Sequence, residues 1–343
     1  MIGEHTDYNG GFVLPTPIPR RCRVELAPRN DRLARVGSAN VQGAESILEY
    51  TVGAEVPGRG WLDYVQGVTH VLNQAGYSVQ GFDLWIQSSV PLGSGLASSA
   101  ALEVSLLRAL RSSFALELDD LRLALIGKRV ENDFVGARTG VMDQMAASLA
   151  REGTALFIDT HSLDYRHVPL PAGAELVVLG SGVSHQHARG NYNTRRTECE
   201  RACELLGVAQ LRDVTSADLP ALTALPEPLG RRARHVVTEN DRVLAAVEAL
   251  QAADLERLGA LFYASHESQR DLYEVSIPEI DLMVDLARAH PDVYGARLTG
   301  GGFGGSVVLL ARAGTGHDVA HRVAQDYAHQ SGRTPTVLVS AAQ

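Results

Sequence analysis

The chain has 343 residues, a formal net charge of −9 and 45% hydrophobic residues. This length fits two domains, and the composition is that of a folded globular protein rather than a disordered one. The negative charge disfavours nucleic acid and anionic membranes as partners, so local groups must hold any bound phosphate. No apolar run approaches the ~18 residues of a membrane-spanning helix, and the first residues lack the basic and apolar parts of a signal peptide.

The sequence predicts no zinc site. The cysteines, Cys22, Cys199 and Cys203, do not have the spacing of zinc ligands, and His185 and His187 have no further ligand at a suitable distance along the chain. We therefore expect reduced thiols and a cytoplasmic protein.

Lys128 is the single lysine among 31 basic residues. It follows neither the glycine-rich turn of a Walker A loop nor the strand pattern of a protein kinase. If the protein binds ATP, it does so without either of these lysines.

The first half of the chain is predicted to mix short strands with helices. Taken in order, we expect strands at 12–14, 22–26 and 46–52, a helix at 61–75, a strand at 82–86, helices over 102–114 and 119–135, and strands within 153–180.

The second half is richer in predicted helix. Helices are expected at 194–206, 229–251, 255–272 and 278–290, followed by a strand at 293–298, a turn at 299–305, a strand at 306–311, a helix at 317–330 and a strand at 335–340. The order of these last elements is typical of an α+β split-βαβ domain. We place the boundary near residue 175, which gives an N-terminal domain over 1–175 and a C-terminal domain over 176–343.

A segment rich in glycine and serine, residues 91–99, connects a predicted strand to a predicted helix. Unpaired backbone N–H groups at a helix N-terminus bind anions, and Gly93 and Gly95 let the backbone approach a phosphate closely. Ser98 and Ser99 add hydroxyl groups for phosphate or Mg²⁺. The segment is predicted to bind phosphate, with a serine cap after a flexible turn as the alternative.

The turn at 299–305 holds five glycines in seven residues. A plain hairpin needs one or two. The excess indicates that the backbone passes close to another loop or to a ligand, with a bulged hairpin as the alternative.

Polar side chains also gather near the N-terminus, where Glu4, His5 and Asp7 stand close together in the sequence. A sugar needs paired donors and acceptors for its hydroxyl groups, and these residues supply them. A surface loop is the alternative interpretation.

Two acids, Asp143 and Glu131, complete a set that phosphoryl transfer requires. Phosphoryl transfer needs a group that orients or deprotonates the hydroxyl that receives the phosphoryl group, and it needs oxygen ligands that hold Mg²⁺. A helix cap explains Asp143 equally well, and a solvated helix end explains Glu131.

Taken together, these motifs resemble the galactokinases of the GHMP kinase superfamily. Residues 3–11, Gly-Glu-His-Thr-Asp-Tyr-Asn-Gly-Gly, look like the galactokinase signature. Residues 91–100 look like the superfamily's phosphate loop, and 298–305 look like its third motif. Residues 140–144 and 192–200 also match the galactokinases in order and spacing, so the resemblance covers nearly the whole chain.

The resemblance implies an α+β fold with an N-terminal ribosomal S5-like domain and a C-terminal ferredoxin-like domain. It also implies Mg²⁺- and ATP-dependent phosphorylation of α-D-galactose at its C1 hydroxyl. We expect a monomer that acts on small molecules. Two alternatives are a kinase of a related sugar, such as N-acetylgalactosamine or L-arabinose, and a sensor that binds galactose and ATP without turnover.

Roles for single residues follow from the same resemblance. Asp143 would be the catalytic group facing the C1 hydroxyl, while Ser99 and Glu131 would hold Mg²⁺. The sugar would be contacted by Glu4, His5, Asp7, Gly140, Asp143 and Tyr192. ATP would be bound by Trp61 near the adenine and by Gly93, Ser94, Gly95, Leu96, Ala97, Ser98 and Ser99.

The sequence departs from the galactokinases at two points. Their arginine six residues before the signature glutamate, beside the transferring phosphate, would fall before Met1 when counted back from Glu4. We therefore expect the chain as written to turn over more slowly than a version extended upstream. Ala97 is a smaller departure, because many relatives have serine there.

Overall fold

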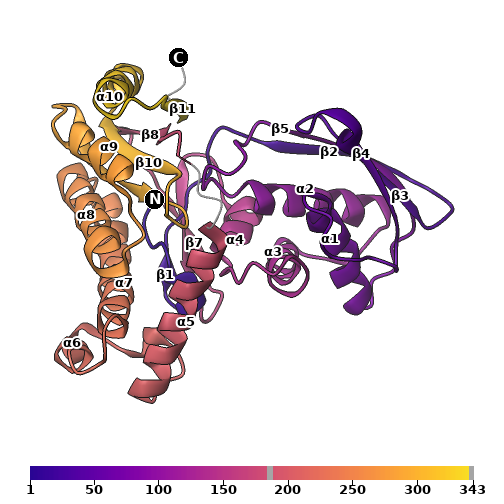
Figure 1. Ribbon diagram of the computed structural model, residues 1–343, viewed down its shortest axis with the longest axis horizontal. Helices are drawn as coiled ribbons and strands as arrows, with labels where there is room; N and C mark the ends of the chain where they lie inside the picture. The colour runs from indigo at the N-terminus through magenta and orange to yellow at the C-terminus, as the bar shows by residue number, and fades with distance from the viewer. Residues whose placement is uncertain (184–187, 340–343) are drawn as a thin grey trace. The chain divides into compact units, whose positions relative to one another are not determined.

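The computed structural model describes residues 1–183 and 188–339, so His185 and His187 lie outside the described residues. The chain divides into two compact units (Figure 1). The larger unit comprises Met1–Ile18, Gly93–Leu96 and Ala150–Gln343, and the smaller unit comprises Pro19–Leu92 and Ala97–Leu149.

These units do not coincide with two consecutive ranges divided near residue 175. Strand β1 (Phe12–Val13) pairs with β6 (Thr154–Asp159), which pairs with β7 (Tyr165–Pro169). This three-stranded sheet ties the N-terminal segment to residues that follow 150. Because a sheet is held by hydrogen bonds between distant parts of the chain, no local composition marks such a boundary.

The larger unit also contains an antiparallel four-stranded sheet in the order β11 (Thr336–Val339), β8 (Ala174–Gly180), β10 (Ser306–Arg312) and β9 (Val293–Thr299). Its helices can be followed in Figure 1: α5 (Ala188–Leu206), α6 (Leu219–Leu222), α7 (Leu229–Gln251), α8 (Leu255–Ser268), α9 (Pro278–Arg288) and α10 (Gly316–Ser331). A π-helical turn, η6 (Gln269–Tyr273), extends α8.

Alternation along the strands explains why both faces of this sheet are covered. Val307 and Leu309 of β10 belong to a core shared with α5, α9, α10 and the first half of α7, whereas Val308 and Leu310 belong to a second core shared with α8 and the second half of α7. Successive side chains of a strand point to opposite faces, so a wholly apolar strand needs cover on both sides.

The smaller unit has a four-stranded sheet in the order β2 (Cys22–Pro28), β5 (Phe82–Ser88), β3 (Leu33–Ser38) and β4 (Ile47–Thr51), in which β3 and β5 are parallel. Its helices are α1 (Leu62–Gln74), α2 (Ser98–Ser113), α3 (Asp120–Arg129) and α4 (Met142–Leu149), with the π-helical turn η3 (Val130–Val135) after α3. One apolar core joins the sheet to α1, α2 and α3.

Most of the predicted elements are confirmed. The predicted helix at 229–251 has the observed bounds of α7, and the chain closes with the predicted order of strand, turn, strand, helix and strand. Strand β3 was not predicted. The helices predicted at 119–135 and 255–272 each change to π-helical geometry in their last turn.

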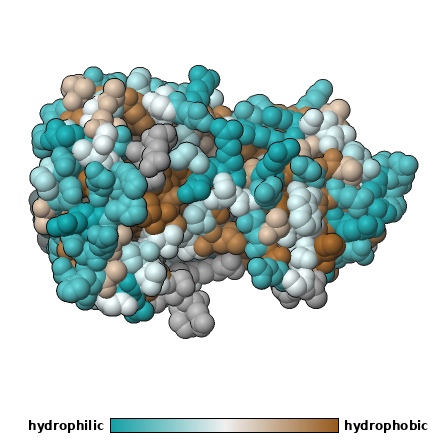
Figure 2. Space-filling model, turned by 90° about the horizontal axis from the view of Figure 1, so that it is seen from above, coloured by the Kyte–Doolittle hydropathy of each residue, from teal (hydrophilic) through white to brown (hydrophobic). Residues whose placement is uncertain are grey.

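The face of the molecule shown in Figure 2 is mostly polar. The large hydrophobic side chains that are exposed are scattered along the described sequence: Ile47, Val56, Trp85, Leu92, Tyr165, Leu205 and Leu244. None of the described helices combines the length and the apolar character that crossing a membrane requires.

Candidate functional site

The polar N-terminal segment lies inside the larger unit. Ile2 and Leu14 form a β-bridge, and the Thr6 hydroxyl donates to the Gly3 carbonyl at 2.7 Å. Glu4 is 4% exposed and His5 is 3% exposed. These contacts exclude a surface loop, because a solvated loop would not bury two charged or titratable side chains.

Glu4 is held against β9. Its Oε2 forms an ion pair with Arg297 Nη2, and its Oε1 accepts a hydrogen bond from Thr299 Oγ1 at 3.1 Å. Arg297 is fully buried and also donates from Nη1 to the Met1 carbonyl at 2.8 Å. A buried charge is tolerated only when it is paired and hydrogen-bonded, so this pair fixes both side chains.

A second buried acid supports the same segment. Glu239 of α7 accepts hydrogen bonds from the Gly3 N–H at 3.1 Å and from the Ser265 hydroxyl at 2.6 Å. Burial alone would raise the pKa of Glu239, but the positive charges of Arg242 and Arg297 and the Ser265 hydrogen bond bring it down to about 2. Glu239 is therefore ionised and anchors the backbone just before Glu4.

Neither Arg297 nor Glu239 was among the predicted site residues. Both are charged residues within apolar, regularly patterned elements, a predicted strand and a predicted helix. A charge on the buried face of such an element indicates a partner elsewhere in the chain. The sequence contained this signal but did not identify the partner.

His5 lies within a cluster of aromatic rings. Its ring centroid is 5.2 Å from that of Tyr192 and 4.7 Å from that of Tyr273, and its Nδ1 lies 2.9 Å from the Tyr8 hydroxyl. Burial first, and then the nearby His235 and Arg195, lower the pKa of His5 to about 3. The ring is therefore neutral near pH 7 and can donate one hydrogen bond and accept another.

Asp7 and Tyr192 are near this cluster. Asp7 begins the short 3₁₀ helix η1 (Asp7–Asn9), is half-buried, and accepts a hydrogen bond from the Tyr8 N–H at 3.1 Å. Tyr192 is on α5, with its ring also 5.5 Å from that of Tyr8. Four of the predicted sugar contacts thus belong to the larger unit: Glu4, His5, Asp7 and Tyr192.

The first half of the phosphate loop packs on the glycine-rich turn. A Cβ placed on Gly300 would lie 2.9 Å from the Gly95 Cα, and the Ser306 hydroxyl donates to the Ser94 carbonyl at 2.8 Å. Gly300 has a φ of +82°. Of the two explanations for the extra glycines, close approach to another loop is confirmed.

The second half of the phosphate loop begins α2 in the smaller unit. Ala97 precedes this helix with a φ of +57°. The Ser99 hydroxyl then donates to Glu131 Oε1 at 2.5 Å, and Glu131, at the π-helical turn η3, is 5% exposed. A hydroxyl and a carboxylate oxygen, adjacent and on rigid elements, are ligands that Mg²⁺ accepts.

These residues fit a magnesium ion whose remaining ligands are water and phosphate. The described residues contain no group of three or more His, Cys, Asp or Glu side chains suited to a metal. Mg²⁺ keeps several waters and is commonly bound by one or two carboxylates together with substrate phosphates, so a larger protein ligand set is not needed.

Asp143 is exposed in the first turn of α4, and Gly140 is buried in the segment just before this helix. Beneath them lies a residue that was not predicted, Glu103 of α2, which is fully buried. Burial, and then the charges of Glu131 and Asp143, raise the pKa of Glu103 well above its usual value. This shift favours the neutral form of Glu103, in which it adds no third negative charge to this region.

Trp61 lies at the start of α1 and packs partly buried against the core of the smaller unit. Its Nε1 is buried and has no hydrogen-bond partner among the described residues. An indole N–H usually finds an acceptor when it is buried. The core contact agrees with simple packing, and the N–H is a donor that a ligand could use.

Three family models match the chain. The galactokinase galactose-binding signature matches residues 1–28, the GHMP kinases N terminal domain matches 63–151, and the GHMP kinases C terminal domain matches 246–329.

Whole-chain relatives agree with these models. The chain is 45% identical to a galactokinase of Chloroflexus aurantiacus, covering 100% of this chain and 89% of the relative. It is 42% identical to a galactokinase of Streptomyces coelicolor, covering 98% of this chain and 89% of the relative.

Solved structures show the same fold. The galactokinase of Lactococcus lactis, complexed with galactose, superposes with a TM-score of 0.94 at 32% identity and covers 98% of this chain and 89% of that chain. The mevalonate kinase of L. major superposes with a TM-score of 0.64 at 20% identity, covering 98% and 93%.

Proposed function

Because the chain belongs to the galactokinase family, we propose that it transfers the terminal phosphoryl group of ATP to the C1 hydroxyl of α-D-galactose. The products are galactose 1-phosphate and ADP. The observation that carries this proposal is the signature segment itself: Glu4 and His5 are buried, yet each has polar atoms held at fixed positions.

We propose that Glu4, His5, Asp7, Gly140 and Tyr192 recognise the sugar. A site built to hydrogen-bond hydroxyl groups rejects an analogue that lacks or inverts one, because its buried polar groups are then left unpaired. The fixed carboxylate of Glu4 accepts hydrogen bonds, and the neutral ring of His5 both donates and accepts.

For the nucleotide we propose residues 93–99 as the phosphate-binding loop and Trp61 as a neighbour of the adenine. The loop ends at the N-terminus of α2, where unpaired N–H groups and the helix dipole favour an anion. Ser99 and Glu131 would hold Mg²⁺, which when bound supplies positive charge to the phosphate oxygens.

Asp143 is the proposed catalytic residue. As a carboxylate it would orient the C1 hydroxyl and accept its proton as the bond to phosphorus forms. Its place in the first turn of α4 gives it a fixed backbone from which to do so.

We further propose that the protein acts as a monomer in the cytoplasm. Its three cysteines are free thiols, as expected in a reducing compartment. Small molecules are its proposed substrates, and nucleic acid and membranes are not proposed partners.

The test is ADP release by the purified chain with Mg²⁺-ATP and a panel of sugars: galactose, glucose, N-acetylgalactosamine and L-arabinose. We expect galactose to give the highest kcat/KM, and ³¹P NMR to identify a sugar 1-phosphate. Asp143→Asn should lower kcat by about 10²-fold or more, whereas Asp318→Asn, on the exposed face of α10, should not.

Two results would contradict the proposal. Preference for another sugar of the panel would reassign the substrate. Tight binding of galactose and ATP, with no ADP release at any enzyme concentration, would identify a sensor.

A further inference from the structure

Four side chains of the larger unit form a continuous line of hydrogen bonds that ends on His5. The Tyr8 hydroxyl lies 2.9 Å from His5 Nδ1 and 2.7 Å from the Tyr273 hydroxyl, which lies 3.1 Å from Cys199 Sγ. We propose that this line fixes which nitrogen of His5 carries the proton, which makes Tyr8 and Tyr273 positioning residues for sugar recognition. The link to the sugar rests on the proposed function, whereas the effect on His5 does not.

Burial shields this line of hydrogen bonds from water and disfavours the loss of a proton from its hydroxyl and thiol groups. His5, Tyr273 and Cys199 are all buried, and Tyr8 is half-buried. Burial raises the pKa of the Cys199 thiol to about 12, and it raises the pKa values of both tyrosines well above their usual range. The two tyrosines and the thiol therefore keep their protons near pH 7 while the His5 ring stays neutral, and only the direction of the hydrogen bonds can vary.

Hydrogen bonds in such a line point the same way, because each hydroxyl has one proton to donate. If Tyr8 donates to His5 Nδ1, then Tyr273 donates to Tyr8, the Cys199 thiol donates to Tyr273, and the proton of His5 is on Nε2. In the opposite direction Nδ1 carries the proton and Nε2 only accepts. The line thus couples the tautomer of His5 to the Cys199 thiol on α5.

The surroundings of His5 favour the first direction. Nδ1 faces the Tyr8 hydroxyl at 2.9 Å, and a phenol hydroxyl is a stronger hydrogen-bond donor than an imidazole N–H, whereas an imidazole nitrogen is a stronger acceptor than a phenol oxygen. His5 Nε2 is itself buried with no hydrogen-bond partner among the described residues. We therefore assign the proton to Nε2, which leaves a buried N–H as the donor for a ligand oxygen.

Tyr273 is fixed by its backbone as well as by its hydroxyl. Arg195 of α5 donates to the Tyr273 carbonyl at 2.7 Å and to the Glu274 carbonyl at 3.0 Å. Arg232 of α7 donates to the Leu272 carbonyl at 2.6 Å. The chain leaves the π-helical turn here with Glu274 at a φ of +55°, so these contacts hold a turn that is unfavourable for a residue with a side chain.

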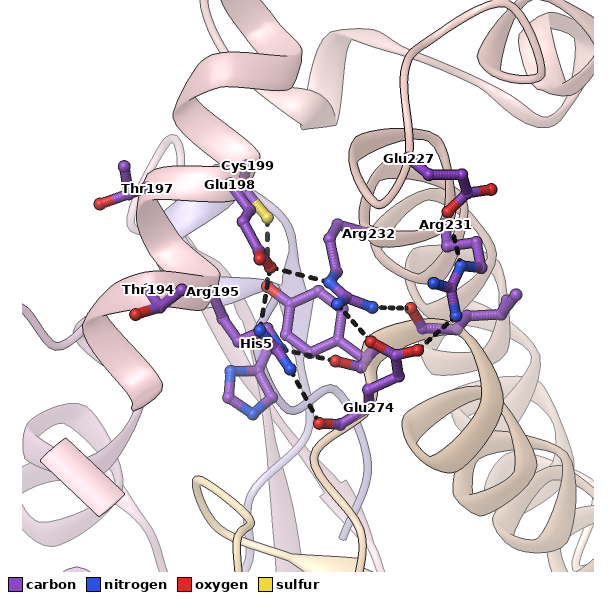
Figure 3. Close-up of polar contacts among 12 residues, drawn as sticks. His5, Thr194, Arg195, Thr197, Glu198, Cys199, Glu227, Arg231, Arg232 and Glu274 are labelled. Atoms are coloured by element: carbon purple, nitrogen blue, oxygen red, sulfur yellow. Dashed lines mark hydrogen bonds and ion pairs between the residues drawn. The ribbon is translucent and has the colours of Figure 1, made fainter. Parts of the chain in front are cut away.

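Figure 3 shows how α5 contributes to this arrangement. Arg195, Glu198 and Cys199 lie on one side of the helix, and Arg195 and Glu198 point toward Arg232 and Glu274. Glu198 accepts a hydrogen bond from Arg232 at 2.8 Å. Tyr192 precedes them on the same helix. One helix therefore carries a predicted sugar contact and the residues that fix Tyr273.

The experiment measures the His5 tautomer and sugar binding separately in the full chain. Uniform ¹⁵N labelling of histidine and long-range ¹H–¹⁵N spectra report which nitrogen is protonated, with His5→Gln used to assign the signals. The variants are Tyr8→Phe and Tyr273→Phe. Tyr327→Phe is the matched control, because it removes another buried hydroxyl, which donates to the Ser181 carbonyl.

We expect the unaltered chain to show the proton of His5 on Nε2. Tyr8→Phe should give a mixture of tautomers, Tyr273→Phe a smaller change in the same direction, and Tyr327→Phe none. The galactose Kd should rise roughly two- to tenfold for Tyr8→Phe, the cost of about one net hydrogen bond, and less for Tyr273→Phe. The change in KM should exceed the change in kcat in both variants.

The proposal is overturned if His5 is protonated on Nδ1, or if its tautomer is the same in Tyr8→Phe, Tyr273→Phe and the unaltered chain. It is also overturned if the tautomer shifts in the folded variants but the galactose Kd stays constant. A chain that never binds galactose, but whose His5 tautomer responds as expected, would refute the proposed function and leave the line of hydrogen bonds established.

Discussion

The Ser99 hydroxyl donates to Glu131 Oε1 at 2.5 Å, which joins the first turn of one helix to a π-helical turn formed 32 residues later. The bond joins the two residues that the resemblance to the galactokinases names together as magnesium ligands. It also keeps the Glu131 carboxylate oriented in a region where burial and neighbouring acids raise the pKa of Glu103 well above its usual value.

We predict that activity requires Mg²⁺ and depends on Glu131. EDTA should abolish ADP release, and excess Mg²⁺ should restore it. Glu131→Gln should raise the Mg²⁺ concentration needed for half-maximal rate by about tenfold or more, because an ionised ligand is replaced by a neutral one. Titration of the rate with Mg²⁺ measures this, with the exposed Glu117→Gln as control. Equal Mg²⁺ requirements in both variants would remove Glu131 from the metal site.

We predict that Lys128 is dispensable. The proposed loop uses backbone N–H groups and Mg²⁺ rather than a lysine, so Lys128→Met should keep most of its activity. The measurement is the KM for ATP at saturating galactose. A loss of ATP binding in this variant, with an unchanged circular dichroism spectrum, would show that the loop needs a lysine after all.

Asp7→Ala should weaken sugar binding without unfolding the protein. Removing a charged acceptor leaves hydroxyl groups unpaired and costs about 1–3 kcal/mol, which corresponds to a rise in the galactose KM of roughly 5- to 150-fold. Because Asp7 is only half-buried, the melting temperature of the Asp7→Ala variant should stay close to that of the unaltered chain. Unchanged galactose kinetics would exclude Asp7 from the sugar site.

Arg297→Met should destabilise the larger unit severely. The substitution leaves the Glu4 carboxylate buried without its partner, which costs about 3–5 kcal/mol. The double variant Glu4→Gln with Arg297→Met should melt at a higher temperature than Arg297→Met alone, because no unpaired charge is then left. If the double variant melts no higher than Arg297→Met, the ion pair between Glu4 and Arg297 is not what holds the N-terminal segment in place.

Acid should destabilise the protein through its buried histidines. Burial is the main cause that lowers the pKa of His5 to about 3 and that of His235 to about 4, both well below the usual 6.5. The unfolded chain therefore binds protons that the folded chain does not, and stability present above pH 6.5 is lost as the pH falls toward 4. Melting temperatures measured from pH 7 to pH 4 should fall less steeply for His235→Gln than for the unaltered chain. Parallel curves would contradict this assignment.

The sequence predicted the elements better than it predicted their partners. The periodic apolar positions of 229–251 and the five glycines of 299–305 are local signals, and both were interpreted correctly. Strand β3 was missed because its buried residues, Ala34 and Val36, alternate with arginine and glycine over a very short stretch. Its place is fixed by pairing with β5, some fifty residues further on.

The same distinction holds for the site. Glu4, His5 and Ser99 stand in recognisable motifs, but Arg297, Glu239, Glu103 and Tyr273 act only through contacts made in the folded chain. Nothing near Tyr273 in the sequence indicates that its hydroxyl meets that of Tyr8. Burial and long-range pairing determine the roles of these residues.

The pairing of β1 with β6 affects the order in which the protein can fold during synthesis. Val13 pairs with Ile158, so the ribosome must make the whole smaller unit before the first strand meets its partner. At roughly 5–20 residues per second, that delay is roughly 7–30 s. During this time the signature segment lacks its buried partners from α7 and β9, such as Glu239 and Arg297, and the smaller unit, which is complete at residue 149, is free to fold first.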